Sequence, residues 1–79
     1  MINIGRLIRD FLKLNKISII EFADIINCSR ATAYRILSCE SIHIGVLYMI
    51  SKKFGHDFFY DISKKVSQEI EGKKAFEQQ

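Results

Sequence analysis

Hydrophobic side chains recur every three or four residues along most of the chain, and no segment shows a clear alternation at every second position. Recurrence every three or four residues is typical of helices with one buried face, and alternation at every second position would indicate a strand. The pattern therefore predicts an all-α fold with five helices around one small core. The expected inward positions, helix by helix, are Ile4, Leu7, Ile8 and Phe11; Phe22, Ile25 and Ile26, with Ala23 small enough for close approach; Ala33, Ile36 and Leu37; Val46, Leu47, Ile50 and Phe54; and Phe59, Ile62, Val66 and Ile70.

Polar residues that favour helix starts divide this pattern. Ser, Asp and Asn are good N-caps because their side chains accept a hydrogen bond from a backbone N–H of the first turn. Residues of this kind precede four of the predicted helices. The helices are expected from Ile4 to about Leu14, from Ile19 to Asn27, from Ser29 to about Leu37, from about Ile44 to Phe54, and from Asp57 toward Gly72.

The central segment predicts two short helices joined by a tight turn. Ser18 and Glu21 have the spacing of a capping box, in which each side chain binds a backbone N–H of the other residue. Asn27 is expected to end the first of these helices, since it tolerates the left-handed conformation. Only Cys28 separates it from Ser29, the cap of the next helix.

The second of these helices carries two outward arginines. Because Ala33, Ile36 and Leu37 must turn inward, Arg30 and Arg35 point to solvent. A helix in the DNA major groove presents its N-terminal residues to base edges, and Arg donates two hydrogen bonds to guanine. The alternative is an ordinary exposed helix whose arginines serve solubility.

Four short motifs along the chain resemble those of one family. They are Ile4-Gly5-Arg6-Leu7-Ile8-Arg9, Ser18-x-x-Glu21-Phe22-Ala23, Ser29-Arg30, and Leu47-x-x-Ile50-Ser51-Lys52-Lys53-Phe54-Gly55. In this order and spacing, residues 4 to about 60 resemble the lambda-repressor-like, Cro and xenobiotic-response-element type of helix-turn-helix regulator. The resemblance implies a five-helix domain with its helix-turn-helix at the second and third helices. It also implies sequence-specific binding of double-stranded DNA, transcriptional regulation, most often repression, and a homodimer on a palindromic operator.

The resemblance assigns roles to particular positions. Those expected to contact bases are Arg30, Ala31, Tyr34 and Arg35. Those expected to contact phosphates are Arg9, Ser18, Ile19, Ser29 and Thr32. Ile19 stands where the family often has Gln, so phosphate binding there falls to backbone N–H groups at the start of the helix. The loop from Ser38 to His43 also departs from the family, and no phosphate contact is assigned to it.

The charge distribution agrees with a nucleic-acid partner. Twelve basic and nine acidic residues give a net charge of +3. This bias is mild, but eight of the twelve basic residues lie before Asp57, on or beside the first four predicted helices, whereas five of the nine acidic residues lie from Asp57 onward. Phosphate contacts are therefore expected from the front of the domain.

Other chemistries find little support in the sequence. Cys28 and Cys39 form no Cys-x-x-Cys pair, and with His43 and His56 they lack the close spacing typical of a structural zinc site, so neither a metal nor a cofactor is expected. No nucleophile has a plausible base, and an enzyme is not expected. The longest apolar run is too short to span a membrane, and helix one starts too near Met1 for a targeting segment, so a cytoplasmic location is expected.

The end of the chain leaves two possibilities open. The domain is expected to occupy residues 1–72, with a polar tail at 73–79. From Lys64 onward the fifth helix is longer than a minimal DNA-binding domain needs. Its outer half either packs on a second copy of the chain or is an exposed helix that frays into the tail.

Two alternatives to a free-standing regulator remain. A protein-binding module is suggested by Ile19, Leu37 and the run Phe58-Phe59-Tyr60, which together can form an apolar surface. The second alternative is a DNA-binding antitoxin, which belongs to the same resembling type and would use the fifth helix to hold a toxin. A protein bound to this C-terminal helix is therefore the second partner expected, after DNA.

Overall fold

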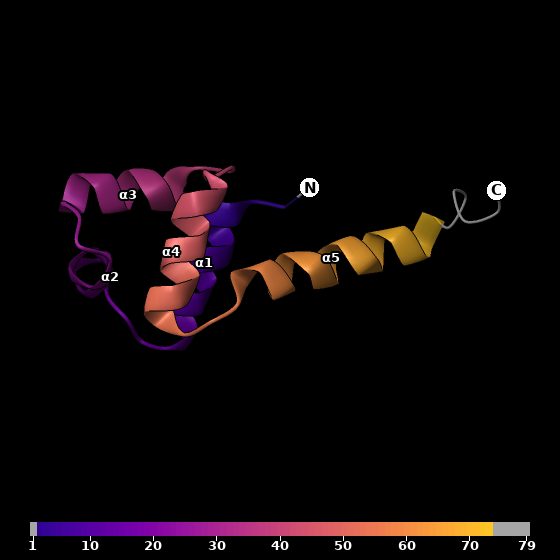
Figure 1. Ribbon diagram of the computed structural model, residues 1–79, viewed down its shortest axis with the longest axis horizontal. Coiled ribbons are helices and arrows are strands. Elements are labelled where there is room, and N and C mark those ends of the chain that lie inside the picture. Colours follow the sequence, from indigo (N-terminus) through magenta and orange to yellow (C-terminus); the bar gives the residue numbers. More distant parts are fainter. Residues whose placement is uncertain (1, 74–79) are drawn as a thin grey trace.

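Local capping chemistry divides the chain into five helices. The computed structural model describes residues 2–73 and contains no strand within that range. The elements are α1 (Ile4–Leu14), α2 (Ile19–Ile26), α3 (Arg30–Ser38), α4 (Ile44–Phe54) and α5 (Phe58–Lys73) (Figure 1). The predicted all-α class with five helices is confirmed for these residues. Of the tail predicted at 73–79, residue 73 is the last of α5, and residues 74–79 lie outside the described part.

Side chains before the helices bind the orphan N–H groups of the first turns. Asn3 Oδ1 accepts a hydrogen bond from the N–H of Arg6 at 2.9 Å, and Asp57 Oδ1 accepts one from the N–H of Tyr60 at 3.0 Å. At α4 the cap is His43, whose Nδ1 accepts the N–H of Gly45 at 3.0 Å. Histidine is not among the preferred caps, so this start follows from the hydrophobic pattern more than from capping preference.

The core lies between α1, α2, α3 and α4 and is closed by the start of α5. It differs from the predicted set in several residues. Val66 and Ile70, which the pattern placed inside, are 47% and 50% exposed because α5 runs beyond the core. Leu12 is buried although the pattern placed it outside the inner face, and Ile25 is 40% exposed although the pattern placed it inside. Phe58 is buried, whereas Phe59 is only half-buried. The buried hydrophobic residues are Ile8, Leu12, Phe22, Ala23, Ile26, Ala33, Leu37, Leu47, Ile50 and Phe58.

An aromatic cluster joins four segments at one end of this core. The ring of Phe11 on α1 lies 5.9 Å from that of Phe54 on α4 and 5.2 Å from that of Phe58 on α5, both edge to face. Phe22 on α2 stacks on Phe54 at 5.7 Å. Edge-to-face and offset pairs of this kind stabilise beyond their buried area. The start of α5 is therefore fixed to the helical body.

The N-terminus of α1 is joined to the segment that follows α3. The N–H groups of Ile4 and Gly5 donate to the carbonyl oxygens of Glu40 and Cys39, each at 2.9 Å. A Cβ on Gly5 would lie 2.5 Å from the Cys39 oxygen and 2.6 Å from that of Leu37. Only glycine fits this close approach, which fixes the position of α3 relative to α1.

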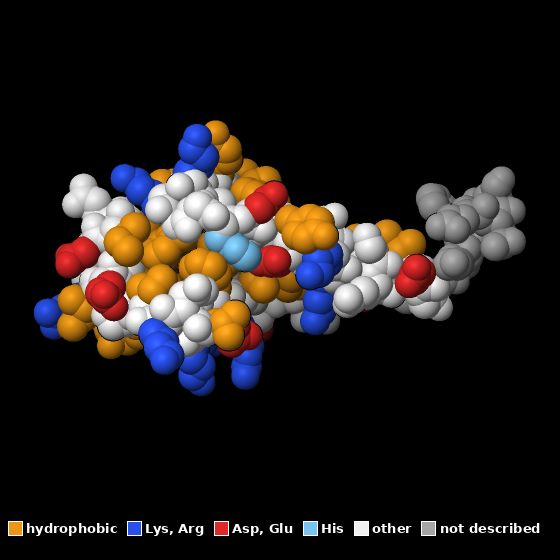
Figure 2. All heavy atoms as spheres, turned by 90° about the horizontal axis from the view of Figure 1, so that it is seen from below, with side chains coloured by type: hydrophobic (Ala, Val, Ile, Leu, Met, Phe, Trp, Pro, Cys, Tyr) orange, Lys and Arg blue, Asp and Glu red, His pale blue; other side chains and the backbone are white. Residues whose placement is uncertain are grey.

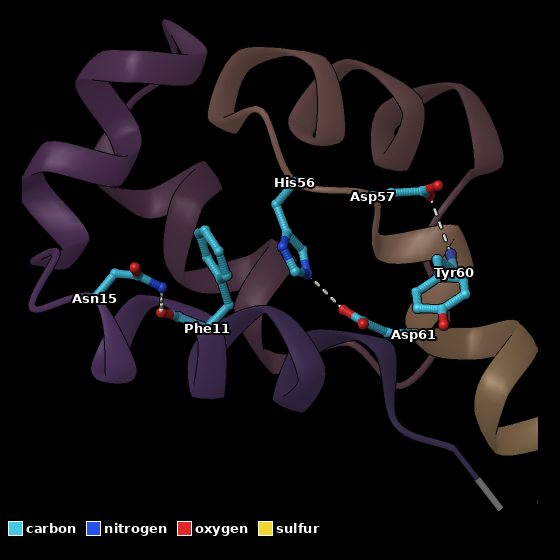
Figure 3. A network of polar contacts seen from close by, with 6 residues as sticks. All are labelled: Phe11, Asn15, His56, Asp57, Tyr60 and Asp61. Carbon is cyan, nitrogen blue, oxygen red and sulfur yellow. Dashed lines mark hydrogen bonds and ion pairs between the residues drawn. The ribbon is translucent and has the colours of Figure 1, made fainter.

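The first turn of α5 is held by polar contacts as well as by packing. His56 Nε2 lies 2.6 Å from Asp61 Oδ2 (Figure 3). The imidazole also packs on two aromatic rings, with its centroid 4.6 Å from that of Phe11 and 4.6 Å from that of Phe58. Beyond this turn the helix leaves the body, and every residue from Ser63 to Gly72 is exposed (Figure 1). The core thus uses only the beginning of a helix that continues into solvent.

Candidate nucleic-acid interface

A short turn sets the angle between α2 and α3. Asn27 has φ 61° and ψ 54°, the left-handed conformation that was predicted to end the helix. The N–H of Cys28 donates to the Ala23 carbonyl at 2.9 Å, which binds the turn back onto α2. Only residues 27–29 separate the two helices, so α3 leaves α2 in a fixed direction.

The start of α2 is stabilised by a capping box. The N–H of Glu21 donates to Ser18 Oγ at 3.1 Å, and the N–H of Ser18 donates to Glu21 Oε1 at 2.8 Å. The N–H groups of Ile19 and Ile20 come first in the helix and have no partner within it, by the nature of a helix start. Ile19 is half-buried against the core, so its backbone, not its side chain, is available to an anion at this site.

The start of α3 has its own hydroxyl pair. Ser29 Oγ accepts the N–H of Thr32 at 3.1 Å and lies 3.0 Å from Thr32 Oγ1, to which it donates. Because Thr32 Oγ1 acts as the acceptor here, the hydrogen of its own hydroxyl remains able to donate. Ser29 and Thr32, which are both predicted to contact phosphates, therefore lie side by side in one small cluster of hydroxyl groups.

The four predicted base-contacting residues share the outer side of α3. Arg30, Ala31, Tyr34 and Arg35 are all exposed, Tyr34 by 57%, while Ala33 is fully buried. Arg30 lies one turn before Tyr34, and Ala31 lies one turn before Arg35, so the four form two adjacent rows. The small side chain of Ala31 leaves space between the longer ones.

A groove of about 400 Å³ runs between α1 and the start of α2. Its charged lining residues are Arg6, Arg9, Lys13 and Asp10 from α1, and Ser18 and Ile19 line it at the start of α2. The predicted phosphate residue Arg9 thus reaches the capped start of α2, the other predicted phosphate site. Three positive side chains beside the N-terminus of a helix favour an anion here, and they outnumber the one carboxylate in the groove, that of Asp10.

A second groove, of about 260 Å³, lies between α3 and the start of α4. Thr32 and Arg35 line it together with Ser41 and His43, two exposed residues to which the sequence assigned no role. His43 Nδ1 accepts the Gly45 N–H, so in the neutral ring the hydrogen is on Nε2, which can donate. No sequence signal identified this histidine, because its neighbours in the groove come from another helix.

Basic side chains are also grouped on the face away from α3. Figure 2 shows Lys and Arg side chains along two opposite edges of that face, with hydrophobic side chains between them.

The two cysteines are free and half-buried, and Cys39 Sγ lies 3.1 Å from the carbonyl oxygen of Arg35. Among the described residues, no three His, Cys, Asp or Glu side chains lie close enough together to hold a metal ion.

Most of the apolar residues that suggested a protein-binding surface are covered. Leu37 and Phe58 are buried, and Ile19 and Phe59 are half-buried. Tyr60 is 61% exposed. The other exposed large hydrophobic residues are spread over the described part of the chain: Leu14, Ile20, Ile25, Tyr34, Ile44 and Tyr48 on the body, and Val66 and Ile70 on the projecting part of α5.

Comparison of the chain with protein-family models, curated proteins and solved structures finds no match. None of the helices described is long and apolar enough to cross a membrane.

Proposed function

We propose that the protein is a helix-turn-helix regulator of the lambda-repressor-like type, which binds a specific sequence in double-stranded DNA and regulates transcription, most simply as a repressor. One observation carries this proposal. The exposed side of α3 bears Arg30, Ala31, Tyr34 and Arg35, and it follows a tightly fixed turn after α2. A convex helix face with long donor side chains is what the major groove accommodates.

The residues around α3 suit a division between base and phosphate contacts. Arg30 and Arg35 read base edges, because guanidinium groups bind guanine O6 and N7 with two hydrogen bonds. The α1–α2 groove, with Arg9 and the N–H groups at the start of α2, holds one phosphate. The α3–α4 groove, with Thr32 and His43, holds another.

A single domain of this size reads only a few base pairs. Two copies on a palindrome double the contacts, and their half-sites lie about 34 Å or a multiple of it apart. A homodimer is therefore part of the proposal.

Selection from a randomised duplex library at two salt concentrations tests the proposal. We expect the purified chain to retain a two-fold symmetric sequence and to lose affinity steeply as salt rises, because phosphate contacts release counterions. Weak retention of every sequence at both concentrations would contradict specific recognition.

A protein-binding module is the rival function. A DNA-binding antitoxin is a variant of this rival, since it holds a protein partner and also binds DNA. The exposed part of α5 favours it, whereas the burial of Leu37 and Phe58 counts against a surface at the front of the domain. Val66→Asp, on the exposed part of α5, separates the two functions. The rival predicts weaker binding of a protein partner through α5, and the DNA proposal predicts that the variant still selects the same half-site sequence, since α3 is unchanged.

A further inference from the structure

A groove of about 450 Å³ lies where α4 meets the start of α5, and the proposed function does not use it. Sites for small molecules are typically grooves or cavities of about 300 to 1,000 Å³ with apolar walls and a few polar groups. None of the proposed DNA contacts lines this groove. Its lining residues are Tyr48, Ser51, Lys52, Gly55, His56, Asp57 and Phe59.

Two aromatic side chains supply most of the apolar lining of the groove. Tyr48 on α4 is 59% exposed and takes no part in the core. Phe59 on α5 is half-buried and packs against the core. A ring bound in the groove would cover apolar surface of both residues, and ring–ring contacts would stabilise it beyond the area that it buries.

One positive and one negative side chain line the same groove. Lys52 lies one turn after Tyr48, and its Nζ is 5.9 Å from the centre of the Tyr48 ring. Asp57 Oδ1 accepts a backbone N–H of the first turn of α5 at 3.0 Å, and a carboxylate has a second oxygen that can accept from a ligand. The neighbouring His56 is turned to Asp61 instead (Figure 3). The groove thus offers an ammonium group and a carboxylate to a ligand.

The two charges and the aromatic lining together fit a free aromatic amino acid. Its carboxylate and ammonium groups are opposite in sign to Lys52 and Asp57, and its side chain provides the ring. An aromatic acid or an aromatic amine would form a charge-assisted hydrogen bond with only one of the two residues. An aromatic side chain inside a polypeptide has neither charge on its backbone. The charge pattern therefore favours the zwitterion.

We propose that the groove between α4 and α5 binds a free aromatic amino acid. The carboxylate of the ligand lies at Lys52 and its ammonium group at Asp57. Its ring lies against Tyr48 and Phe59. Because the lining residues come from α4 and from the start of α5, the ligand also holds these two elements together. A ligand that binds only the folded chain raises its stability, so binding is expected to raise the melting temperature.

NMR titration of the full chain with L-phenylalanine tests the proposal. We expect a dissociation constant of about 1 mM, because the ligand is small and the groove is open to solvent. The shifted backbone amides are expected to centre on residues 48–59. Phenethylamine lacks the carboxylate and N-acetylphenylalanine lacks the ammonium group, and each is expected to bind roughly tenfold more weakly.

Two variants assign the charged groups of the ligand. Lys52→Met is expected to weaken phenylalanine binding roughly tenfold and to leave phenethylamine binding unchanged. Asp57→Asn keeps a good cap for α5, and it is expected to weaken binding of phenylalanine but not of N-acetylphenylalanine. The matched controls are Lys53→Met and Glu69→Gln, which remove the same charges at exposed residues outside the groove and should bind phenylalanine like the unchanged chain.

Absence of saturable binding at tens of millimolar overturns the proposal, and so do shifts centred outside the groove. Equal affinity for the amide of N-acetylphenylalanine also overturns it, because the groove would then take an aromatic side chain of a polypeptide. A control variant that weakens binding as much as its partner contradicts the assigned contacts. The titration contains no DNA, so its failure leaves the DNA proposal intact, and a chain that selects no duplex sequence can still bind the amino acid.

Discussion

Gly5 donates its N–H to the carbonyl oxygen of Cys39 at 2.9 Å, and a Cβ at the same residue would lie 2.5 Å from that oxygen. The hydrogen bond and the close contact are two results of one approach between α1 and the end of α3. Because α3 carries the proposed base-reading residues, this approach also sets the position of the candidate interface on the body.

Gly5→Ala is expected to lower the free energy of unfolding by about 2 to 4 kcal/mol, because α1 must move away from two carbonyl oxygens and its hydrogen bonds weaken. Urea unfolding followed by circular dichroism measures this loss. Gly72→Ala is the matched control, since a Cβ there has nothing within 4 Å and alanine is the better helix former. The prediction fails if both variants are as stable as the unchanged chain.

Asn27→Ala is expected to cost roughly 1 kcal/mol, because alanine pays the full steric penalty of the left-handed conformation at φ 61°. Asn27→Gly should remain within about 0.5 kcal/mol of the unchanged chain, as glycine adopts this conformation freely. Thermal and urea unfolding of the pair provide the comparison. Equal losses in both variants would show that the amide side chain matters, and not the backbone angle.

Arg30→Ala and Arg35→Ala are each expected to weaken binding of the selected duplex by about 1 to 3 kcal/mol and to relax base preference at one position of each half-site. Titration of the selected site and of single-base variants of it gives both quantities. Lys64→Ala, on the projecting helix, serves as the control for loss of one positive charge. If the loss is the same for every duplex, these arginines bind phosphates.

Arg9→Ala is expected to weaken binding of all duplexes by a similar factor and to lower the salt dependence, the slope of log affinity against log salt, by about 1. The reason is that Arg9 lies in the groove beside the start of α2, where a phosphate can be held but no base edge is read. Affinity measured across a series of salt concentrations gives the slope. A change of base preference in this variant would contradict the assignment.

Local signals in the sequence predicted the helices well. The caps at Asn3, Ser18, Ser29 and Asp57 act through residues only three positions away, so their effect is visible without a fold. The left-handed end of α2 at Asn27 was predicted for the same reason. The outward position of Arg30 and Arg35 also followed from the helical period, because the opposite side of α3 is apolar.

Contacts between distant segments were not predictable in this way. Helical periodicity gives the centre of an inner face, but the neighbouring helix decides how far the buried area extends, which is why Leu12 is buried and Ile25 exposed. The helical period placed Phe59 inside the core, but the adjacent Phe58 is the fully buried residue, and its ring packs edge to face on that of Phe11. The place of His43 in a groove with Arg35 likewise depends on how α3 and α4 pack.

The projection of α5 beyond the core leaves a part of the chain whose length the fold does not restrict. Residues 63–72 are all exposed and extend over about 15 Å of helix (Figure 1). Because none of them is buried in the core, whole turns added to or removed from this segment would change how far α5 extends without changing how the other four helices pack.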